Sequence, residues 1–256
     1  MSTPKNQSVQ KAFALLGSFH GPDEWVSNAE LSRRAHLSKA AAHRLIKTLE
    51  DIGVVMRDAR GCYRPGIALA SLSRNISIGD LVRRASMDIL TDLARRLTGV
   101  IQLGILEKGM VTYAAKIGDV NRVAVPSRVG AQLEPYCTAL GKALLSGLTD
   151  EQLDDFLRDG DLIALTPQTI TDGRRLIAEV NDIRYRGFAV DDREVDPSIC
   201  CIGVPIRDPS GHVIAAISMS DSSAHMGPAW RDEVSMALLS TAEQISRKVY
   251  PSPFAQ

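Results

Sequence analysis

Residues 27–66 decide the fold of the first part of this chain, and they read SNAELSRRAHLSKAAAHRLIKTLEDIGVVMRDARGCYRPG. Ser27 lies three residues before Glu30, which is the spacing of a capping box and predicts the start of a short helix. Ser38 is a second N-cap candidate, and the apolar residues after it recur at helical spacing up to Gly53, where a C-terminal cap belongs. Two helices joined by about three residues, the second one longer, are typical of a helix-turn-helix.

Two short extended segments follow the second helix, at residues 54–57 and 62–64, and the polar turn DARG lies between them. Extended segments around a Gly-containing turn predict a β-hairpin. A hairpin directly after a helix-turn-helix is a wing, so the sequence predicts a winged helix-turn-helix, which binds DNA. Upstream, residues 9–19 carry apolar side chains at three- and four-residue spacing, and this predicts an amphipathic helix ended by Gly21 and Pro22.

The outer face of the second helix is basic. Side chains that project away from its packing face can reach into a major groove, and basic residues around the wing can contact phosphates. Arg44 and Lys47 are the leading candidates, although any one of these residues taken alone could equally be a solvated surface residue. The full set of predicted DNA contacts is Lys39, His43, Arg44, Lys47, Arg57, Arg60 and Arg64.

Length and composition set the wider frame. A chain of 256 residues with 45% hydrophobic and 23% charged residues is typical of a globular protein with two domains. Residues 1–75 contain 11 Lys/Arg and 6 Asp/Glu, whereas the remaining residues contain 19 and 24, so a basic head precedes an acidic body. Because no apolar stretch is long enough to span a membrane and no signal peptide is evident, we expect a cytoplasmic protein without a membrane partner.

The sequence pattern changes near residues 75–78. We therefore expect a DNA-binding domain with a linker helix over residues 1–75 and a second domain over residues 76–256, which begins with an amphipathic helix at 80–97. Beyond that helix, two antiparallel hairpins are predicted, at residues 100–106 with 110–117 and at 199–206 with 213–220. Helical patterns fit residues 139–146, 150–158, 173–186 and 229–249. Hairpins mixed with helices predict an α+β domain with an antiparallel sheet.

Motifs of catalysis are missing from the sequence. It contains no G-x-S-x-G, no Gly-rich phosphate loop, no H-E-x-x-H and no C-x-x-C, so we expect no enzyme, no metal, no cofactor and reduced thiols. Two alternatives stay open: a small-molecule enzyme with a DNA-binding appendage, and a redox sensor through Cys200 or Cys201; a thiolate pair of Cys201 with His212 or His225 is one conceivable catalytic arrangement. Adjacent strand residues point to opposite faces, however, and cysteine more often serves as a small buried hydrophobe.

A ligand site is better supported at the helix that begins ALGKALLSGL, residues 139–148. Thr138 is its N-cap candidate, and the N–H groups of Ala139 and Leu140 at a helix N-terminus suit a carboxylate. Gly141 removes a side chain where another group could approach the backbone. The plain alternative is a helix start capped only by solvent.

Residues 29–66 resemble the winged helix-turn-helix of IclR-type bacterial transcriptional regulators. The runs PYCTALGKALLSGLTDEQ (135–152), ITD (170–172) and RGFAVDDREVDPSICCIGVPIRDPSGHVIAAISMSD (186–221) resemble that family's effector domain. The resemblance implies a GAF-like domain that binds small organic acids between the helix start and the sheet. Ala40 and Ala41 stand where the family commonly has Ser and Thr, and Pro65 stands where it favours Leu, so the operator preference does not carry over.

The resemblance also implies site residues and partners. Ala139 and Leu140 would offer backbone donors to the acid, and the lining side chains would be Asp191, Cys201, Ser218 and Ser220, with Leu133, Tyr136 and Ile199 as further candidates. Ser218 and Ser220 lie on one face of a strand, where both hydroxyls can donate, whereas Met219 alternates away and predicts core packing. We therefore expect a homodimer or dimer of dimers on a pseudopalindromic double-stranded operator, controlling catabolic genes in response to a small organic acid, aromatic acids included.

Overall fold

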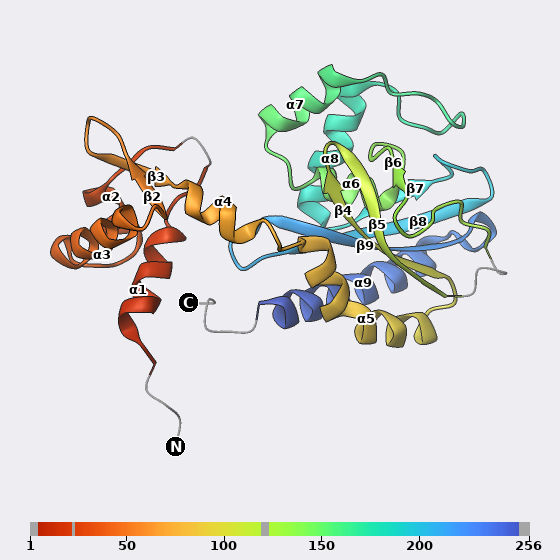
Figure 1. The fold of residues 1–256 in the computed structure, drawn as a ribbon. Helices are drawn as coiled ribbons and strands as arrows, with labels where there is room; N and C mark the ends of the chain where they lie inside the picture. The colour runs from red at the N-terminus through yellow and green to blue at the C-terminus, as the bar shows by residue number, and fades with distance from the viewer. Residues whose placement is uncertain (1–4, 22–23, 119–122, 251–256) are drawn as a thin grey trace. The chain divides into compact units, whose positions relative to one another are not determined.

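Two units make up the chain in the computed structural model, which describes residues 5–21, 24–118 and 123–250 (Figure 1). Their bounds are Met1–Ile76 and Ser77–Gln256, and each is described here by itself. Among the described helices, none combines the length and the apolar character that crossing a membrane requires.

The first unit is a winged helix-turn-helix. Its helices are α1 (Gln7–Leu16), α2 (Asn28–Arg34), α3 (Lys39–Asp51) and α4 (Ile67–Ser73), and its strands are β1 (Val26–Ser27), β2 (Val55–Arg57) and β3 (Cys62–Pro65). The strands form an antiparallel sheet in the order β1-β3-β2, so the predicted wing hairpin is confirmed and a short third strand is added to it.

Local capping fixes where the two central helices begin and end. The Ser27 hydroxyl accepts from the Glu30 N–H and the Ser38 hydroxyl accepts from the Ala41 N–H, as their N-cap spacing predicts. Gly53 follows α3 with a φ of +74°, a left-handed conformation that favours glycine at a helix end. Between the helices, the Ser32 hydroxyl donates to the Leu37 carbonyl at 2.6 Å and closes the tight turn.

The predicted extent of the first helix was wrong at both ends. The Asn6 side chain accepts from the N–H groups of Ser8 and Val9, so α1 begins before residue 9. The helix ends at Leu16, and Gly17 is its C-cap because glycine is a poor helix former. Of the two residues expected to end it, Gly21 lies four residues beyond the cap and Pro22 lies outside the described residues.

The second unit is built on a six-stranded antiparallel sheet. The strand order is β6 (Gln132–Leu133), β5 (Met110–Gly118), β4 (Val100–Glu107), β9 (Val213–Ser222), β8 (Ile199–Arg207) and β7 (Ala189–Asp192). Both predicted hairpins are confirmed: β4 pairs with β5, and β8 pairs with β9. The central pairing of β4 with β9 joins segments more than a hundred residues apart and brings Gln102 opposite Ser218.

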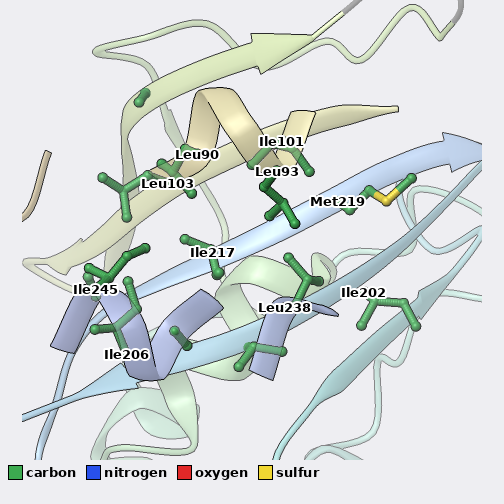
Figure 2. Close-up of a cluster of buried hydrophobic side chains, with 14 of the residues drawn as sticks. Leu90, Leu93, Ile101, Leu103, Ile202, Ile206, Ile217, Met219, Leu238 and Ile245 are labelled. Atoms are coloured by element: carbon green, nitrogen blue, oxygen red, sulfur yellow. The ribbon is translucent and has the colours of Figure 1, made fainter. Parts of the chain in front are cut away.

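Two long helices cover one face of this sheet, α5 (Ile78–Arg96) and α9 (Pro228–Val249), the latter preceded by the 3₁₀ turn Ser223–His225 (Figure 1). Apolar side chains from both helices meet alternate residues of the central strands, and Met219 lies in this core as predicted (Figure 2). Its neighbours Ser218 and Ser220 therefore point to the opposite face of the sheet. The labelled core residues are Leu90, Leu93, Ile101, Leu103, Ile202, Ile206, Ile217, Met219, Leu238 and Ile245.

The opposite face carries α6 (Ala139–Leu145), with α7 (Asp150–Asp159) and α8 (Gly173–Arg186) packed around it. The start of α6 lies directly on the sheet, because a Cβ atom at Gly203 would lie 2.3 Å from the Ala139 carbonyl oxygen and one at Gly104 would lie 2.5 Å from Leu140 Cδ2. Gly104 on β4 and Gly203 on β8, the two strands on either side of β9, thus allow the helix N-terminus to come this close. The polar backbone of that N-terminus is thereby placed beside Ser218 and Ser220.

Candidate functional site

The exposed face of α3 gathers four of the predicted DNA contacts. Lys39, His43 and Lys47 recur every four residues and form one exposed stripe along the helix. Arg44 lies one position aside and lines a surface groove with Ser8 and Lys11 of α1. Lys11 is an exposed cation that the sequence prediction missed, because only the packing of α1 against α3 places it beside Arg44.

The wing arginines differ from one another in how free they are. Arg60 is 91% exposed at the hairpin turn, and its closest carboxylate is Asp58 at 4.0 Å. The Arg57 guanidinium lies 5.8 Å from the centre of the Tyr63 ring. Arg64 stacks on Trp25 at 4.9 Å and its Nε lies 3.1 Å from Met56 Sδ, so these contacts tie it to the body of the unit. Of the three, Arg60 is the most accessible to a phosphate.

A second polar site lies in the other unit, in a cavity between α6 and the sheet. Eight of the nine predicted effector residues line it: Leu133, Ala139, Leu140, Asp191, Ile199, Cys201, Ser218 and Ser220. The ninth, Tyr136, does not. Its hydroxyl donates to the Ile163 carbonyl and accepts from the Ile163 N–H, both at 2.9 Å, and its ring packs with α7 and α8.

The N-terminus of α6 faces this cavity with a side-chain cap. The Thr138 hydroxyl accepts from the Gly141 N–H at 2.9 Å, which leaves the earlier N–H groups of Ala139 and Leu140 at the lining. Gly141 serves a different purpose from the one expected. A Cβ atom there would lie 2.2 Å from the Pro135 carbonyl oxygen, so the glycine admits the preceding loop and not a ligand.

The two serines of β9 differ in their hydrogen bonds, which the sequence could not show. The Ser220 hydroxyl donates to Gln102 Oε1 at 3.2 Å and lies 3.1 Å from Cys201 Sγ. The Gln102 amide in turn donates to the Ser127 hydroxyl. The Ser220 hydroxyl therefore already donates its proton to another protein group. The Ser218 hydroxyl also lines the cavity, and within the described ranges it has no hydrogen-bond partner.

Asp191 is the only carboxylate among the residues that the structure shows lining the cavity. Its Oδ1 accepts from the Glu194 N–H at 2.7 Å, and 2% of the residue is exposed. Burial raises the pKa of Asp191 to about 7, with the nearby Glu194 carboxylate acting in the same direction, so the group titrates near neutral pH. An anionic ligand placed beside it would favour the protonated form.

One wall of the cavity is the segment that includes Val125, Pro126 and Ser127. Lys116 Nζ donates to the carbonyls of Val125 and Ser127, each at 2.8 Å, and holds this segment against β5. The cavity volume is ≈ 30 Å³, well below the roughly 150 Å³ of a protein cavity that admits benzene. An organic acid can therefore enter only if part of the lining moves.

The cysteines show no sign of thiolate chemistry. Burial raises the pKa of Cys201 well above its ordinary value, and burial raises that of Cys200 to about 12. His212 contacts Ser210 and Asp208, and His225 contacts Asp221, so neither histidine is the partner that such a thiolate pair needs. A thiolate pair and a redox sensor both require an accessible thiol of low pKa, whereas Cys200 and Cys201 are buried with raised pKa values.

Both units of the chain match models of known protein families. The family model described as "Bacterial transcriptional regulator IclR C-terminal" matches residues 76–247, and the model described as "IclR helix-turn-helix domain" matches residues 8–59. The chain belongs to the IclR family. It is therefore a bacterial-type transcriptional regulator with a DNA-binding and an effector domain.

Individual IclR relatives support this assignment over nearly the whole chain. The HTH-type transcriptional regulator KipR of Bacillus subtilis is 27% identical and covers 96% of this chain and 98% of its own length. The Thermotoga maritima IclR structure has a TM-score of 0.62 at 30% identity, with 95% and 98% covered. An IclR homolog from Microbacterium hydrocarbonoxydans, complexed with 4-hydroxybenzoate, has a TM-score of 0.64 at 22% identity and covers 96% and 100%, which shows a shared fold.

Several lining residues of this IclR pocket escaped the sequence prediction. Gln102 and Tyr113 come from β4 and β5, and Ser127 comes from the wall segment. Tyr113 is buried and hydrogen-bonds with Thr138, and burial raises its pKa. The sequence contains one sign that Gln102 belongs to a polar site. It is a polar residue inside the apolar run VIQLGIL, and a buried polar residue needs a hydrogen-bond partner.

Proposed function

We propose that this IclR-family regulator reads double-stranded DNA with α3 and its wing, binds a small organic acid in the cavity of its second unit, and changes its DNA affinity when the acid binds. The observation that carries the proposal is the combination of an exposed basic recognition helix with a small pocket lined by polar groups in one chain. The acid would be a signal for genes of its own breakdown, as the family resemblance implies.

The DNA contact is supported by the accessibility of the basic side chains. Lys39, His43 and Lys47 present one exposed stripe, and Arg44 with Lys11 extends it toward α1. Arg60 and Arg57 at the wing can add contacts to phosphates, which position the protein without reading sequence. A pair of such heads in a homodimer, or in a dimer of dimers, would meet the half-sites of a pseudopalindromic operator.

The acid site is supported by where its donors converge. The free N–H groups of Ala139 and Leu140 and the Ser218 hydroxyl can donate to a carboxylate, because their positions border the same cavity. Asp191 can accept from a hydroxyl of the ligand or, when protonated, donate to it. Leu133 and Ile199 supply apolar surface opposite these groups.

Coupling between the two sites is supported by the small volume of the cavity. A ligand that is larger than this cavity binds only to a conformation with a displaced lining, so it has a different affinity for the two conformations. That difference is the requirement for an effect on DNA binding. The candidate moving part is the wall held by Lys116 and Gln102.

Two experiments test the proposal. Fluorescence anisotropy with the DNA upstream of the protein's own gene should show salt-dependent binding that Arg44→Gln weakens and Arg33→Gln leaves unchanged. Arg33 is a matched control, since it is an exposed arginine paired with Glu30 on α2. A thermal-shift screen of organic acids, 4-hydroxybenzoate included, should yield an acid that raises the melting temperature of the wild type more than that of Ser218→Ala at the same concentration. No rise in DNA anisotropy at low salt, or equal responses of both proteins to the acid, would refute the corresponding half.

A further inference from the structure

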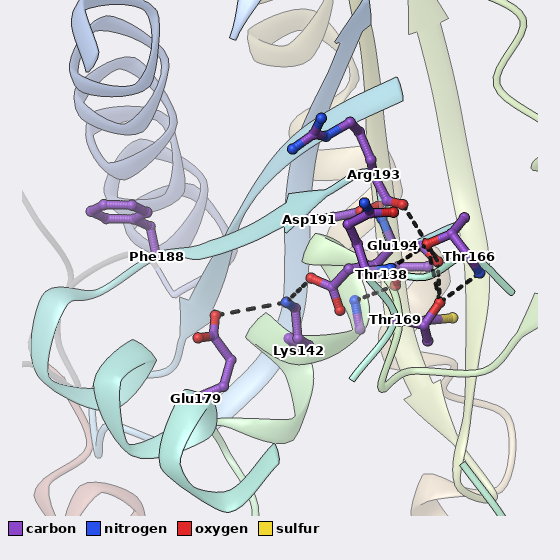
Figure 3. Close-up of polar contacts among 12 residues, drawn as sticks. Thr138, Lys142, Thr166, Thr169, Glu179, Phe188, Asp191, Arg193 and Glu194 are labelled. Carbon is purple, nitrogen blue, oxygen red and sulfur yellow. Dashed lines mark hydrogen bonds and ion pairs between the residues drawn. The ribbon is translucent and has the colours of Figure 1, made fainter. Parts of the chain in front are cut away.

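A buried ion pair lies behind the acid pocket, between α6 and the turn that follows β7 (Figure 3). Lys142 Nζ lies 2.5 Å from Glu194 Oε1, and the exposed fractions of the two residues are 1% and 4%. Neither residue lines the cavity itself. Their role is therefore not direct contact with a ligand.

The pair ties together three segments that are far apart in the sequence. Glu194 donates its backbone N–H to Asp191 Oδ1, so it is bonded directly to the carboxylate of the pocket. Its carbonyl accepts from the Thr169 hydroxyl at 2.6 Å, in the loop before α8. Lys142 belongs to α6 and also lies 3.7 Å from Glu179 of α8. The turn after β7, whose Glu194 N–H bonds to the Asp191 carboxylate, is thus held against α6 by this charge pair.

Stability alone does not account for this arrangement. Removing two charges from water costs free energy that their attraction only partly returns, and well-packed apolar residues would serve stability as well or better. Glu194 Oε2 is buried and has no hydrogen-bond partner among the described residues, which adds to the cost. Burial accordingly raises the pKa of Glu194, although the neighbouring lysine opposes that shift.

We propose that Lys142 and Glu194 are positioning residues of the acid pocket: their ion pair ties α6 to the turn after β7 and so holds one buried positive and one buried negative charge next to the Asp191 carboxylate. The role of this ion pair in acid binding rests on the proposed function. Its effect on Asp191 does not, because that effect can be measured without an acid. A positioning residue of this kind acts on the ligand through Asp191, whose charge meets the incoming acid.

The charges around Asp191 make the proposal specific. Glu194 lies on the turn after β7 and Lys142 on α6; Cys201 is the residue opposite Asp191 on β8, Cys200 is next to it on the other face of that strand, Tyr113 lies on β5 and Cys137 in the segment before α6. The thiols and the phenol stay neutral because burial raises the pKa of each. The ion pair therefore supplies the two charges that act on Asp191 in opposite directions: Glu194 raises its pKa and Lys142 lowers it.

The test is a carbon-13 NMR titration of the full-length protein labelled at its aspartate carboxyls, with the Asp191 signal assigned by its loss in Asp191→Asn. Glu194→Gln should lower the titration midpoint of Asp191 by about 1 pH unit, and Lys142→Met should raise it. Glu243→Gln removes the carboxylate of an exposed ion pair with Arg247 on α9, and it should leave the midpoint unchanged. Lys142→Arg keeps the charge and should restore the wild-type midpoint.

A purely structural role would move the midpoint in the same direction in both variants or not at all, and either result would overturn the proposal. If Lys142→Met does not fold, Glu194→Gln decides by itself: a fallen midpoint supports the proposal and an unchanged or raised one overturns it. This titration needs no acid, so it stays decisive if the screen finds none and the proposed function fails.

The affinity for 4-hydroxybenzoate provides a second readout where the wild type binds it. Because the acid and an ionised Asp191 repel each other, affinity should fall by up to about tenfold per pH unit above the midpoint. The fall should begin at lower pH in Glu194→Gln than in the wild type. A pH profile shared by both proteins, alongside a shifted Asp191 midpoint, would overturn the link between the ion pair and the acid.

Discussion

The basic face of α3 and the acid pocket are both polar sites, but the first is exposed to solvent and the second is buried. On α3 the side chains of Lys39, His43, Arg44 and Lys47 are exposed, and of these Lys47 lies 3.5 Å from the Glu50 carboxylate. In the pocket, Asp191, Ser220, Gln102 and Cys201 are buried and hydrogen-bonded to other protein groups. The difference teaches that substitutions on α3 should act separately, whereas those in the pocket should act through one another.

The strongest way to break this comparison is to show that the two units do not unfold separately. Ile46 lies in the core of the first unit and Ile217 in that of the second, and each is fully buried. Truncation of either to alanine should destabilise its own unit by about 2–5 kcal/mol. Trp25 and Trp230, the two tryptophans of the chain, report on one unit each in a urea titration followed by fluorescence.

Variants that each retain one tryptophan, by Trp25→Phe or Trp230→Phe, assign the two signals. We expect Ile46→Ala to shift the Trp25 transition and leave the Trp230 transition in place, and Ile217→Ala to do the reverse. Coincident shifts of both transitions would mean one cooperative body and would contradict the description of two units.

A second prediction uses the pH dependence of the pocket. The pKa of Asp191 is about 7 in the folded chain against about 3.9 in an unfolded one, so the folded state binds its proton more tightly. The stability that this group contributes is complete below pH ~4 and is lost as pH rises to about 7, a change of roughly 4 kcal/mol. Asp191→Asn should remove that dependence from the Trp230 transition. Parallel stability profiles of wild type and variant between pH 4 and 8 would contradict the raised pKa.

The exposed face provides the third prediction. Lys39→Gln and Lys47→Gln should each weaken DNA binding by about 1–3 kcal/mol, and the double variant should show the sum because the two positions are about 12 Å apart along α3. Each lost phosphate contact should also reduce the salt dependence of log K by about 0.9. Anisotropy titrations over a salt series measure both quantities. A double variant no weaker than either single one would show that the two residues act as a unit.

The smallest expected effect is on acid affinity, and it distinguishes the roles of the two serines of β9. Ser218→Ala should weaken acid binding by about 1 kcal/mol through one lost hydrogen bond. Ser220→Ala and Gln102→Leu should instead be coupled, since each removes the partner of the other; a double-mutant cycle by calorimetry should give about 0.5–3 kcal/mol. Zero coupling would mean that the Ser220–Gln102 bond does not shape the pocket.

Local patterns predicted the winged helix-turn-helix almost completely. Caps at Ser27 and Ser38, the left-handed Gly53 and the wing turn depend on neighbours a few residues away, and the sequence shows such neighbours directly. The first helix was misplaced because its limits depend on Asn6 and Gly17, which lie outside the apolar pattern. The short strand β1 exists only through its pairing with Tyr63 and Cys62.

Less of the pocket could be predicted from the residues themselves. Strand alternation separated Met219 from the two serines, and the helix start at Thr138 was evident, but the family resemblance was needed for Asp191 and Cys201. Gln102 enters through the register of β4 with β9, and the Lys142–Glu194 pair joins residues 52 positions apart. Tyr136 was assigned to the wrong side because nothing local shows that its hydroxyl bonds to Ile163.

The central claim is that an acid in the pocket changes the affinity of α3 and its wing for DNA. The most direct test is an anisotropy titration of the upstream DNA fragment, in the absence and presence of a saturating acid from the thermal-shift screen, with Ser218→Ala in parallel. We predict a change in Kd of about 5- to 150-fold in the wild type, the same change in Ser218→Ala only at an acid concentration about fivefold higher, and an equal reciprocal effect of DNA on acid affinity. An identical DNA Kd with and without an acid that demonstrably binds would contradict the account.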